Sequence, residues 1–234
     1  MPNTNLVDVP AGLSDVVAPA AALTARDDHL LPAPSALRPL FPDGGLRRGS
    51  TVSVTGVGAT SLAFALLAEA SAAGAWCAAV GLDSLGLIAA DHAGVTLPRL
   101  ALVPQPGPDW PTIVAALLDA FEIVLLHPPG STGPRLQRRL AARLRERDRV
   151  LVWLGADLAG MSPDVRLVGT AGVWDGLGWG HGHLRNRQLH VRAEGRRLAG
   201  RPRHAAVWLP GPDGRVVASV TRLGDRPALV EESA

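Results

Sequence analysis

Residues 45–62 read GLRRGSTVSVTGVGATSL, and this stretch decides the fold. Residues 51–55, four of which are β-branched, predict a strand, and the glycines that follow predict a tight turn. The Ala/Leu-rich residues 61–73 then predict a helix. A strand, a glycine turn and a helix in this order begin an α/β unit, so we expect a parallel sheet covered by helices.

The same stretch has the outline of a P-loop but lacks its chemistry. A P-loop needs Gly-x-x-x-x-Gly-Lys-Ser/Thr, because backbone amides cradle the phosphates and lysine neutralises their charge. Counted from Gly56, the second glycine, the lysine and the hydroxyl are replaced by Ser61, Leu62 and Ala63. The chain contains no lysine at all, since its 23 basic residues are arginines.

This degenerate loop has two interpretations. The amides and dipole of a helix N-terminus can hold an anion even without lysine. Thr60 and Ser61 are also favoured N-cap residues, and this structural role is the one we expect. We therefore predict no bound cofactor at the four loop positions, which are Gly56, Gly58, Thr60 and Ser61.

Composition limits the class of protein further. The 234 residues are 47% hydrophobic, which suits one α/β domain with a buried core. No apolar run has membrane-spanning length and no signal peptide is suggested, so we expect no membrane partner. The single cysteine, Cys77, fits a reducing compartment, and we expect a cytoplasmic protein.

The organisation of the chain follows from changes in pattern. Residues 1–40 are predicted to be a partly ordered N-terminal arm, residues 41–225 the core domain, and residues 226–234 a flexible tail. Within the core, residues 156–182 are predicted to be rich in loops. The alternating segments that follow predict antiparallel strands at 183–193, 205–209 and 216–222.

Arginines gather in two segments, residues 135–149 and residues 181–203, each of which holds seven. Such segments indicate either an anionic partner or a solvated face. For the first, which predicts an amphipathic helix with leucines on its core side, we favour a solvated face. For the second, both interpretations stay open.

The chain resembles the RecA ATPase core over residues 35–225. The resemblance rests on the order of several motifs: GLRRG before the first strand, WCAAVGLD at 76–83, RLAARL at 139–144 and VLVWL at 150–154. It implies a RecA-like parallel sheet flanked by helices, with antiparallel strands at its C-terminal end. Self-association and contact with RecA itself are further expectations.

Within that superfamily, the short lysine-free loop and the stretch WDGLGWGHGH at 174–183 resemble the actinobacterial ImuA-type proteins. These are the RecA-like members of a mutagenesis cassette induced by DNA damage, in the SOS response. In that family the protein works with ImuB, an inactive relative of Y-family polymerases, and with an error-prone replicative-type DNA polymerase. The resemblance implies a non-catalytic adaptor in translesion DNA synthesis.

The positions that the resemblance would assign to an ATPase site hold other residues. The strand at 122–126 should deliver a metal-binding aspartate, but His127 follows it. The catalytic glutamate expected two residues after Asp83 is Leu85. Without lysine, most of the electrostatic stabilisation of a triphosphate is absent, and we predict no enzyme activity. His181 and His183 form too small a ligand set, so we also predict no metal site. A divergent ATPase is a further alternative.

The main alternative is a protein that binds single-stranded DNA without ATP. Residues 155–182 occupy the place of RecA's second DNA-binding loop, where Trp174 and Trp179 are candidates for base stacking or for an interface anchor. Core packing is the third interpretation, and we favour it for Trp174. By the period of two, Arg185 and Arg187 share one strand face. They would form a basic rim with the arginines of the following turn, which are Arg196, Arg197, Arg201 and Arg203.

Overall fold

A computed structural model of the chain describes residues 29–83, 85–130, 133–155, 158, 161–178 and 181–219. Its strands are β1 (Leu30–Pro32), β2 (Gly45–Arg47), β3 (Thr51–Gly56), β4 (Cys77–Val80), β5 (Leu100–Val103), β6 (Ile123–Leu126), β7 (Val150–Leu154), β8 (Val165–Trp174), β9 (Leu177–Gly178), β10 (His181–Gly182), β11 (Arg187–Glu194), β12 (Arg203–Trp208) and β13 (Val217–Ala218). Its helices are α2 (Ala59–Ala72), α3 (Leu87–His92), α4 (Trp110–Ala120) and α5 (Pro134–Glu146), with short 3-10 helices η1 (Arg38–Leu40), η2 (Leu97–Arg99) and η3 (Arg196–Leu198). Most of the expected N-terminal arm and all of the expected tail lie outside the described residues, so the domain boundaries stay predictions.

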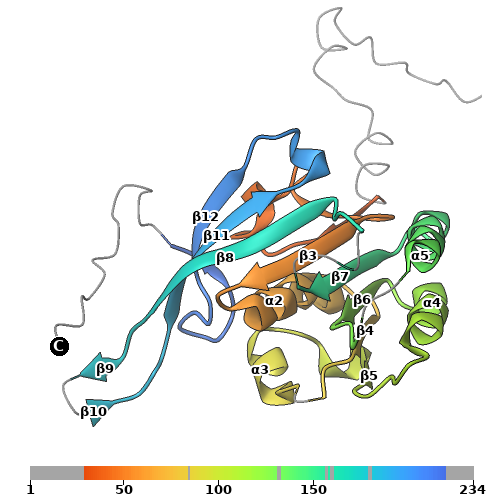
Figure 1. Ribbon diagram of the computed structural model, residues 1–234. Coiled ribbons are helices and arrows are strands. Elements are labelled where there is room, and N and C mark those ends of the chain that lie inside the picture. Colours follow the sequence, from red (N-terminus) through yellow and green to blue (C-terminus); the bar gives the residue numbers. More distant parts are fainter. Residues whose placement is uncertain are drawn as a thin grey trace, which may run out of the picture.

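The main sheet is parallel on one side and antiparallel on the other. Among the described residues its strand order is β13-β12-β11-β8-β3-β7-β6-β4-β5 (Figure 1). From β8 to β5 each neighbouring pair is parallel, whereas β11, β12 and β13 pair antiparallel, and β11 is also antiparallel to β8. This confirms the predicted α/β class: a parallel sheet flanked by helices, with C-terminal antiparallel strands.

Helices cover both faces of the parallel part (Figure 1). On one face α2, α3 and residues 31–41 pack into a single apolar cluster with the inward side chains of the sheet. On the other face α4 and α5 form a second cluster, to which α5 contributes the buried Leu140 and Leu144. The centre of the sheet is therefore buried from both sides, which explains why β6 and β7 read as continuous apolar runs.

Helix α2 is apolar on nearly every side. All of residues 62–68 are buried, between the sheet and residues 31–41. A helix with no polar face belongs to the interior, and alanine and leucine are strong helix formers. Helix α2, which begins at the degenerate loop, is thus a core element. Because residues 62–68 are packed on all sides, the position of its N-terminus is fixed.

Strand β8 corrects the prediction that residues 156–182 are rich in loops. Val165–Trp174 form one continuous strand that pairs with β3 on one side and with β11 on the other. Its first residues alternate between buried and half-buried positions, as a strand should. The glycines at 169 and 172 weakened the strand signal, because glycine is depleted in strands and usually marks turns.

Beyond the last pair of β8 and β11, Trp174 with Arg187, the chain leaves the main sheet. It leads to β9 and β10, which pair as a short antiparallel hairpin that projects away from the helices (Figure 1). Trp179 lies between these two strands, outside the described residues. None of the helices in the described ranges has the length and apolar content to cross a bilayer.

Candidate functional site

Strand β3 delivers the degenerate loop to the edge of the sheet, where glycine is needed for close packing. A side chain at Gly56 would lie 2.3 Å from the carbonyl oxygen of Gly169, in the neighbouring strand β8. One residue later, the amide of Val57 donates a hydrogen bond of 2.9 Å to that same oxygen. Gly56 therefore allows β3 and β8 to approach closely. The backbone amide of Val57 is already hydrogen-bonded within the protein.

The loop then turns directly into α2 through Gly58. Gly58 is the N-cap residue, with a left-handed φ of 69°, and no side chain caps the helix. The prediction that Thr60 and Ser61 are N-caps is wrong, because the helix begins earlier, at Ala59, and both lie in its first turn. The first amides of the helix have no acceptor within it, so they are available to a ligand.

Arg187 fills the space beside this N-terminus. It is the first residue of β11 and is only 8% exposed. A side chain at Gly58 would come within 2.5 Å of Nη2 of Arg187, so the guanidinium lies directly against the N-cap residue. The turn can carry this arginine only because residue 58 is glycine.

The guanidinium of Arg187 is held on two sides and left without a partner on a third. Its Nε donates a hydrogen bond of 2.9 Å to the carbonyl of Leu209. The indole of Trp174 lies beneath it, with the guanidinium carbon 5.0 Å from the ring centroid. Nη2 is buried and has no hydrogen-bond partner among the described residues. Burial lowers the pKa of Arg187, and no carboxylate in the described ranges counters that shift.

Trp174 does not belong to the core, contrary to the interpretation we favoured from the sequence. It ends β8 and is 39% exposed, with one face on Arg187. Trp and Arg planes stack favourably through the cation–π interaction, worth about 0.5–2 kcal/mol depending on solvent exposure. A partly exposed tryptophan at the edge of a cavity is a typical interface anchor.

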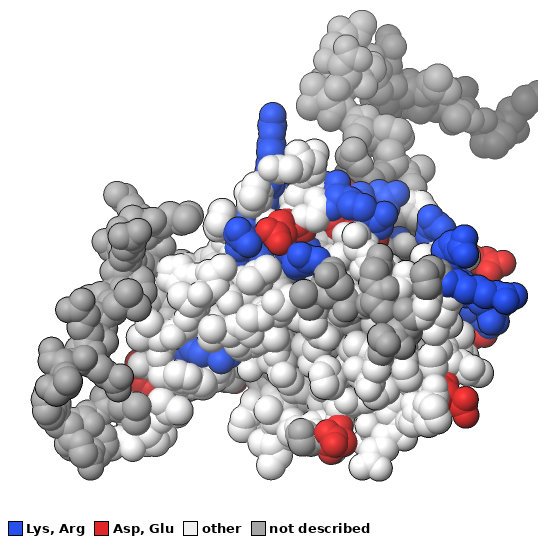
Figure 2. Space-filling model, in the orientation of Figure 1, with Lys and Arg blue, Asp and Glu red and all other residues white. Residues whose placement is uncertain are grey.

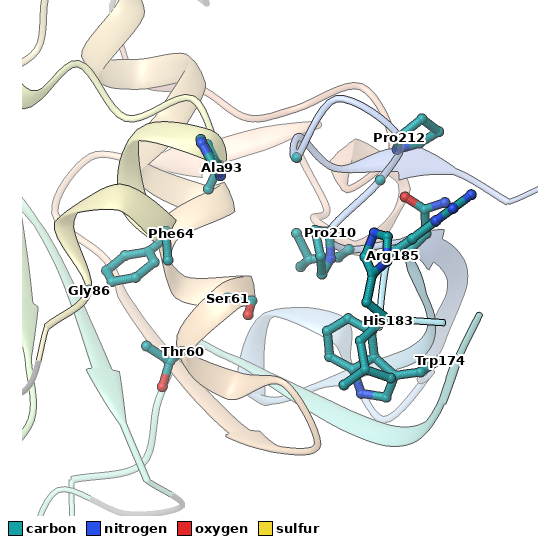
Figure 3. Close-up of a pocket in the computed structure, with 17 residues that line it drawn as sticks. Thr60, Ser61, Phe64, Gly86, Ala93, Trp174, His183, Arg185, Pro210 and Pro212 are labelled. Atoms are coloured by element: carbon teal, nitrogen blue, oxygen red, sulfur yellow. The ribbon is translucent and has the colours of Figure 1, made fainter. Parts of the chain in front are cut away.

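A cavity of about 660 Å³ opens next to Trp174 and the start of α2. Figure 3 shows Thr60, Ser61 and Phe64 on one wall, with Trp174, His183 and Arg185 opposite. Most of the other lining groups are apolar or glycine, and none is a carboxylate. The cavity was not predicted, because it is built from segments more than a hundred residues apart in the sequence.

The positions at which an ATPase would carry a metal-binding aspartate and a catalytic glutamate hold His127 and Leu85. His127 is exposed, and its Nδ1 lies 3.2 Å from the carbonyl oxygen of Gly81. Leu85 is half-buried and packs against the core. Within the described ranges no group of three or more His, Cys, Asp or Glu side chains could hold a metal ion. The side chain of His181 is outside the described part, and whether a metal binds there stays untested.

The arginines of the predicted rim are placed apart by the fold. Arg187 is buried at the start of β11, whereas Arg185 precedes the strand and is exposed, so the prediction that they share a strand face is wrong. Three arginines of the turn are used within the protein. Arg196 forms an ion pair with Asp164, Arg197 forms one with Asp43, and Arg203 donates to the carbonyls of Pro39 and Phe41.

Arg201 is the remaining member of the rim and is exposed. Figure 2 shows arginines gathered over the turn between β11 and β12 and over α5, with acidic groups among them. Much of this positive charge is therefore balanced locally. Three arginines of the predicted rim therefore connect segments of the protein to one another. Arg185 and Arg201 stay exposed, at opposite ends of β11.

Comparison with known proteins gives the family. Residues 39–160, which is more than half of the chain, match the model described as the MT3502 N-terminal domain. The chain belongs to the MT3502 N-terminal domain family. It is also 37% identical, over 106 residues, to the uncharacterized protein Rv3395c of Mycobacterium tuberculosis, in a match covering 45% of this chain and 52% of the relative. The chain thus spans about half the length of the curated relative it matches.

The range that matches the MT3502 N-terminal domain includes part of the site described above. It contains the degenerate loop and α2, together with the positions of Leu85 and His127. It ends before β8, so Trp174 and Arg187 lie beyond it. The site combines a family segment with C-terminal strands outside the matched range.

Proposed function

We propose that this member of the MT3502 N-terminal domain family is a non-catalytic adaptor of the ImuA type, with a RecA-like core. Its role would be in error-prone translesion DNA synthesis after DNA damage, in the cytoplasm. It would bind an ImuB-like inactive polymerase relative, and through it act with an error-prone replicative-type polymerase.

One observation carries the non-catalytic part of the proposal: the space of the phosphate loop is filled by protein. Leu62, at the position of the P-loop lysine, is fully buried in the core. Arg187 lies against Gly58, where a longer loop would need room. A triphosphate would find no lysine in the loop and no magnesium-binding carboxylate at the end of β6.

The adaptor part is supported by apolar surface near the same loop. Exposed large apolar side chains are common at protein interfaces when they cluster beside a cavity. Here Trp174 and Leu184, which are 39% and 49% exposed, lie at the cavity, and Ile88 of the neighbouring α3 is 74% exposed. Partner binding makes use of such surface, whereas an isolated protein gains nothing from it.

Direct binding of single-stranded DNA is less well supported. Such binding uses a continuous positively charged groove with aromatic stacking platforms. Arg196, Arg197 and Arg203 are engaged with acidic or carbonyl groups of the protein itself, which reduces the charge available to phosphates.

The proposal is tested by three measurements on the purified 234-residue chain. We expect a pull-down to recover an ImuB-like partner, and fluorescent ATP with magnesium to show no binding. We also expect little binding of single-stranded DNA at physiological salt. Tight magnesium-dependent ATP binding would refute the adaptor proposal in favour of a divergent ATPase. Salt-steep DNA binding without partner recovery would favour the DNA-binding alternative instead.

A further inference from the structure

The end of α2 carries an unbalanced positive charge. A helix N-terminus holds the equivalent of about half a positive charge, from its unpaired amides. The guanidinium of Arg187 adds a full charge beside it, against the N-cap residue Gly58. Arg187 is more than nine-tenths buried, and its Nη2 has no hydrogen-bond partner in the described ranges.

Such an arrangement is costly unless an anion completes it. A buried charged donor loses its hydration, and proteins normally supply an opposite charge or a hydrogen-bond acceptor. Here the guanidinium lies against the N-cap residue Gly58, and none of the ion pairs between described residues involves Arg187; Asp164 and Asp43 pair with rim arginines. We therefore expect the acceptor for Nη2 of Arg187 to come from outside the described residues.

The cavity beside this place indicates what the acceptor is attached to. Its walls are largely apolar, with Phe64 from α2 and Leu209 and Pro210 from the chain after β12 (Figure 3). Arg185 adds a positive charge to the lining, beside the imidazoles of His183 and His92. A complementary ligand has apolar side chains next to a carboxylate.

We propose that Arg187 and the N-terminus of α2 form an oxyanion site for an acidic side chain of a partner polypeptide, whose apolar neighbours occupy the adjoining cavity. Trp174 covers the guanidinium and is itself 39% exposed. Since Nη2 is itself buried, the proposal requires the indole to rotate away so that the carboxylate reaches it. This inference rests on the proposed adaptor function and names the chemistry of the partner segment.

A peptide fits this site better than a nucleic acid does. A strand of DNA presents a phosphate at each nucleotide, so it needs a row of cations along its path. The cavity offers Arg185 as its one lining arginine among the described residues, and Arg187 is reached singly. One acid flanked by apolar groups matches that distribution of charge.

The test uses fluorescence anisotropy with the 234-residue chain and a labelled peptide that places leucine and phenylalanine beside two glutamates. The control peptide has glutamines in place of the glutamates. We expect the acidic peptide to bind about tenfold or more tightly than the control, since hydrogen bonds between charged groups are the strong ones.

Two variants locate the site and one serves as a matched control. Ser61→Asp puts a carboxylate in the first turn of α2, where it competes for the same donors. We expect it to lower peptide affinity about tenfold while keeping or raising Tm. Arg187→Gln should remove the preference for the acidic peptide. Arg201→Gln removes an exposed arginine at the other end of β11 and should leave binding unchanged.

Several results would overturn the oxyanion site. These are equal affinity for the two peptides, no binding of either, unchanged affinity in Ser61→Asp, or complete displacement of the peptide by oligothymidylate. Because Ser61→Asp lies on a preformed helix, it keeps the test decisive if Arg187→Gln does not fold. Recovery of an ImuB-like partner together with no peptide binding would refute this site and leave the adaptor proposal standing.

Discussion

At the scale of single residues, close packing explains the two glycines in the loop that resembles a P-loop. Gly56 admits the backbone of β8, and Gly58 admits the guanidinium of Arg187. Neither role requires a nucleotide. The loop keeps the backbone freedom of a P-loop while its space is taken by protein groups.

Gly58→Ala tests this account, with Gly44→Ala as its matched control. Both glycines have a left-handed φ, 69° and 74°, but a side chain at Gly44 would meet nothing within 4 Å. We expect both changes to lower the free energy of unfolding, by about 1–3 kcal/mol for left-handed strain. Gly58→Ala should cost more, because it also displaces Arg187. Urea denaturation measures the difference, and equal losses would contradict the contact.

Cys77 gives a second prediction at this scale. Burial, and then the charge of Glu122, raise the pKa of its thiol from 9.0 to about 12. A thiol this far from ionised should not react with a thiol reagent at neutral pH in the native protein, and should react once unfolded. Rapid native-state labelling would show that Cys77 is accessible.

The raised pKa of Cys77 also makes the stability of the fold depend on pH. Since the folded pKa lies above the unfolded one, the folded state keeps the proton more tightly, and its stabilisation is complete below pH 9. It is lost as pH rises from about 9 towards 12. In Cys77→Ala, the fall of Tm over that window should be shallower than in the wild type.

At the scale of elements, an acidic side chain fastens α4 to α5. Asp119 of α4 accepts hydrogen bonds from Arg143 and forms an ion pair with Arg147 at 3.1 Å. The hydrogen bonds from Arg143 are the main reason that the pKa of Asp119 is lowered. The pair lies on the surface, so its contribution is small and sensitive to salt.

We expect Asp119→Asn to lower Tm slightly at pH 7. Because the folded pKa of Asp119 is depressed, its stabilisation is present above the unfolded pKa and is lost as pH falls through the folded one. The difference in Tm between variant and wild type should therefore shrink in acid. The exposed Asp91→Asn is the control. A constant difference down to pH 2, or one unaffected by salt, would rule out the ion pair as its source.

At the scale of the whole molecule, the C-terminal strands hold the segment that precedes the core. Arg203 of β12 donates to the carbonyls of Pro39 and Phe41, the second at 2.7 Å. Arg197 adds an ion pair of 3.0 Å with Asp43. Residues 31–41 in turn cover α2, so the arginines of the predicted rim help to close the core.

Arg203→Ala should loosen that closure. Loss of two hydrogen bonds from a charged donor is expected to cost about 1–3 kcal/mol in the free energy of unfolding, because one is partly buried. Hydrogen exchange at residues 37–47 should accelerate more than in the rest of the sheet. In Arg201→Ala, whose side chain is exposed, both quantities should stay at wild-type values. Equal effects in the two variants would contradict a stabilising role for the hydrogen bonds of Arg203 to Pro39 and Phe41.

The parts that sequence could predict were those with strong local periodicity. The leucines of α5 repeat every fourth residue, and Leu140 and Leu144 are indeed buried. β8 was missed because its glycines make room for Val57, just after β3, and for side chains of β11, contacts that only tertiary structure reveals. Arg187 was assigned to a surface rim, because spacing along a strand cannot tell which face meets the N-terminus of a distant helix. The cavity depends on the same long-range contacts.

The complete burial of Leu62 has a consequence for the engineering of this chain. Lysine at that position would place an ammonium group inside the apolar cluster around α2, at a cost of several kcal/mol. Nucleotide binding would also require a longer loop and the removal of Arg187 from beside Gly58. An attempt to build a P-loop here therefore has to change the loop length, Leu62 and Arg187 together, since a lysine at position 62 alone would be buried in the apolar core.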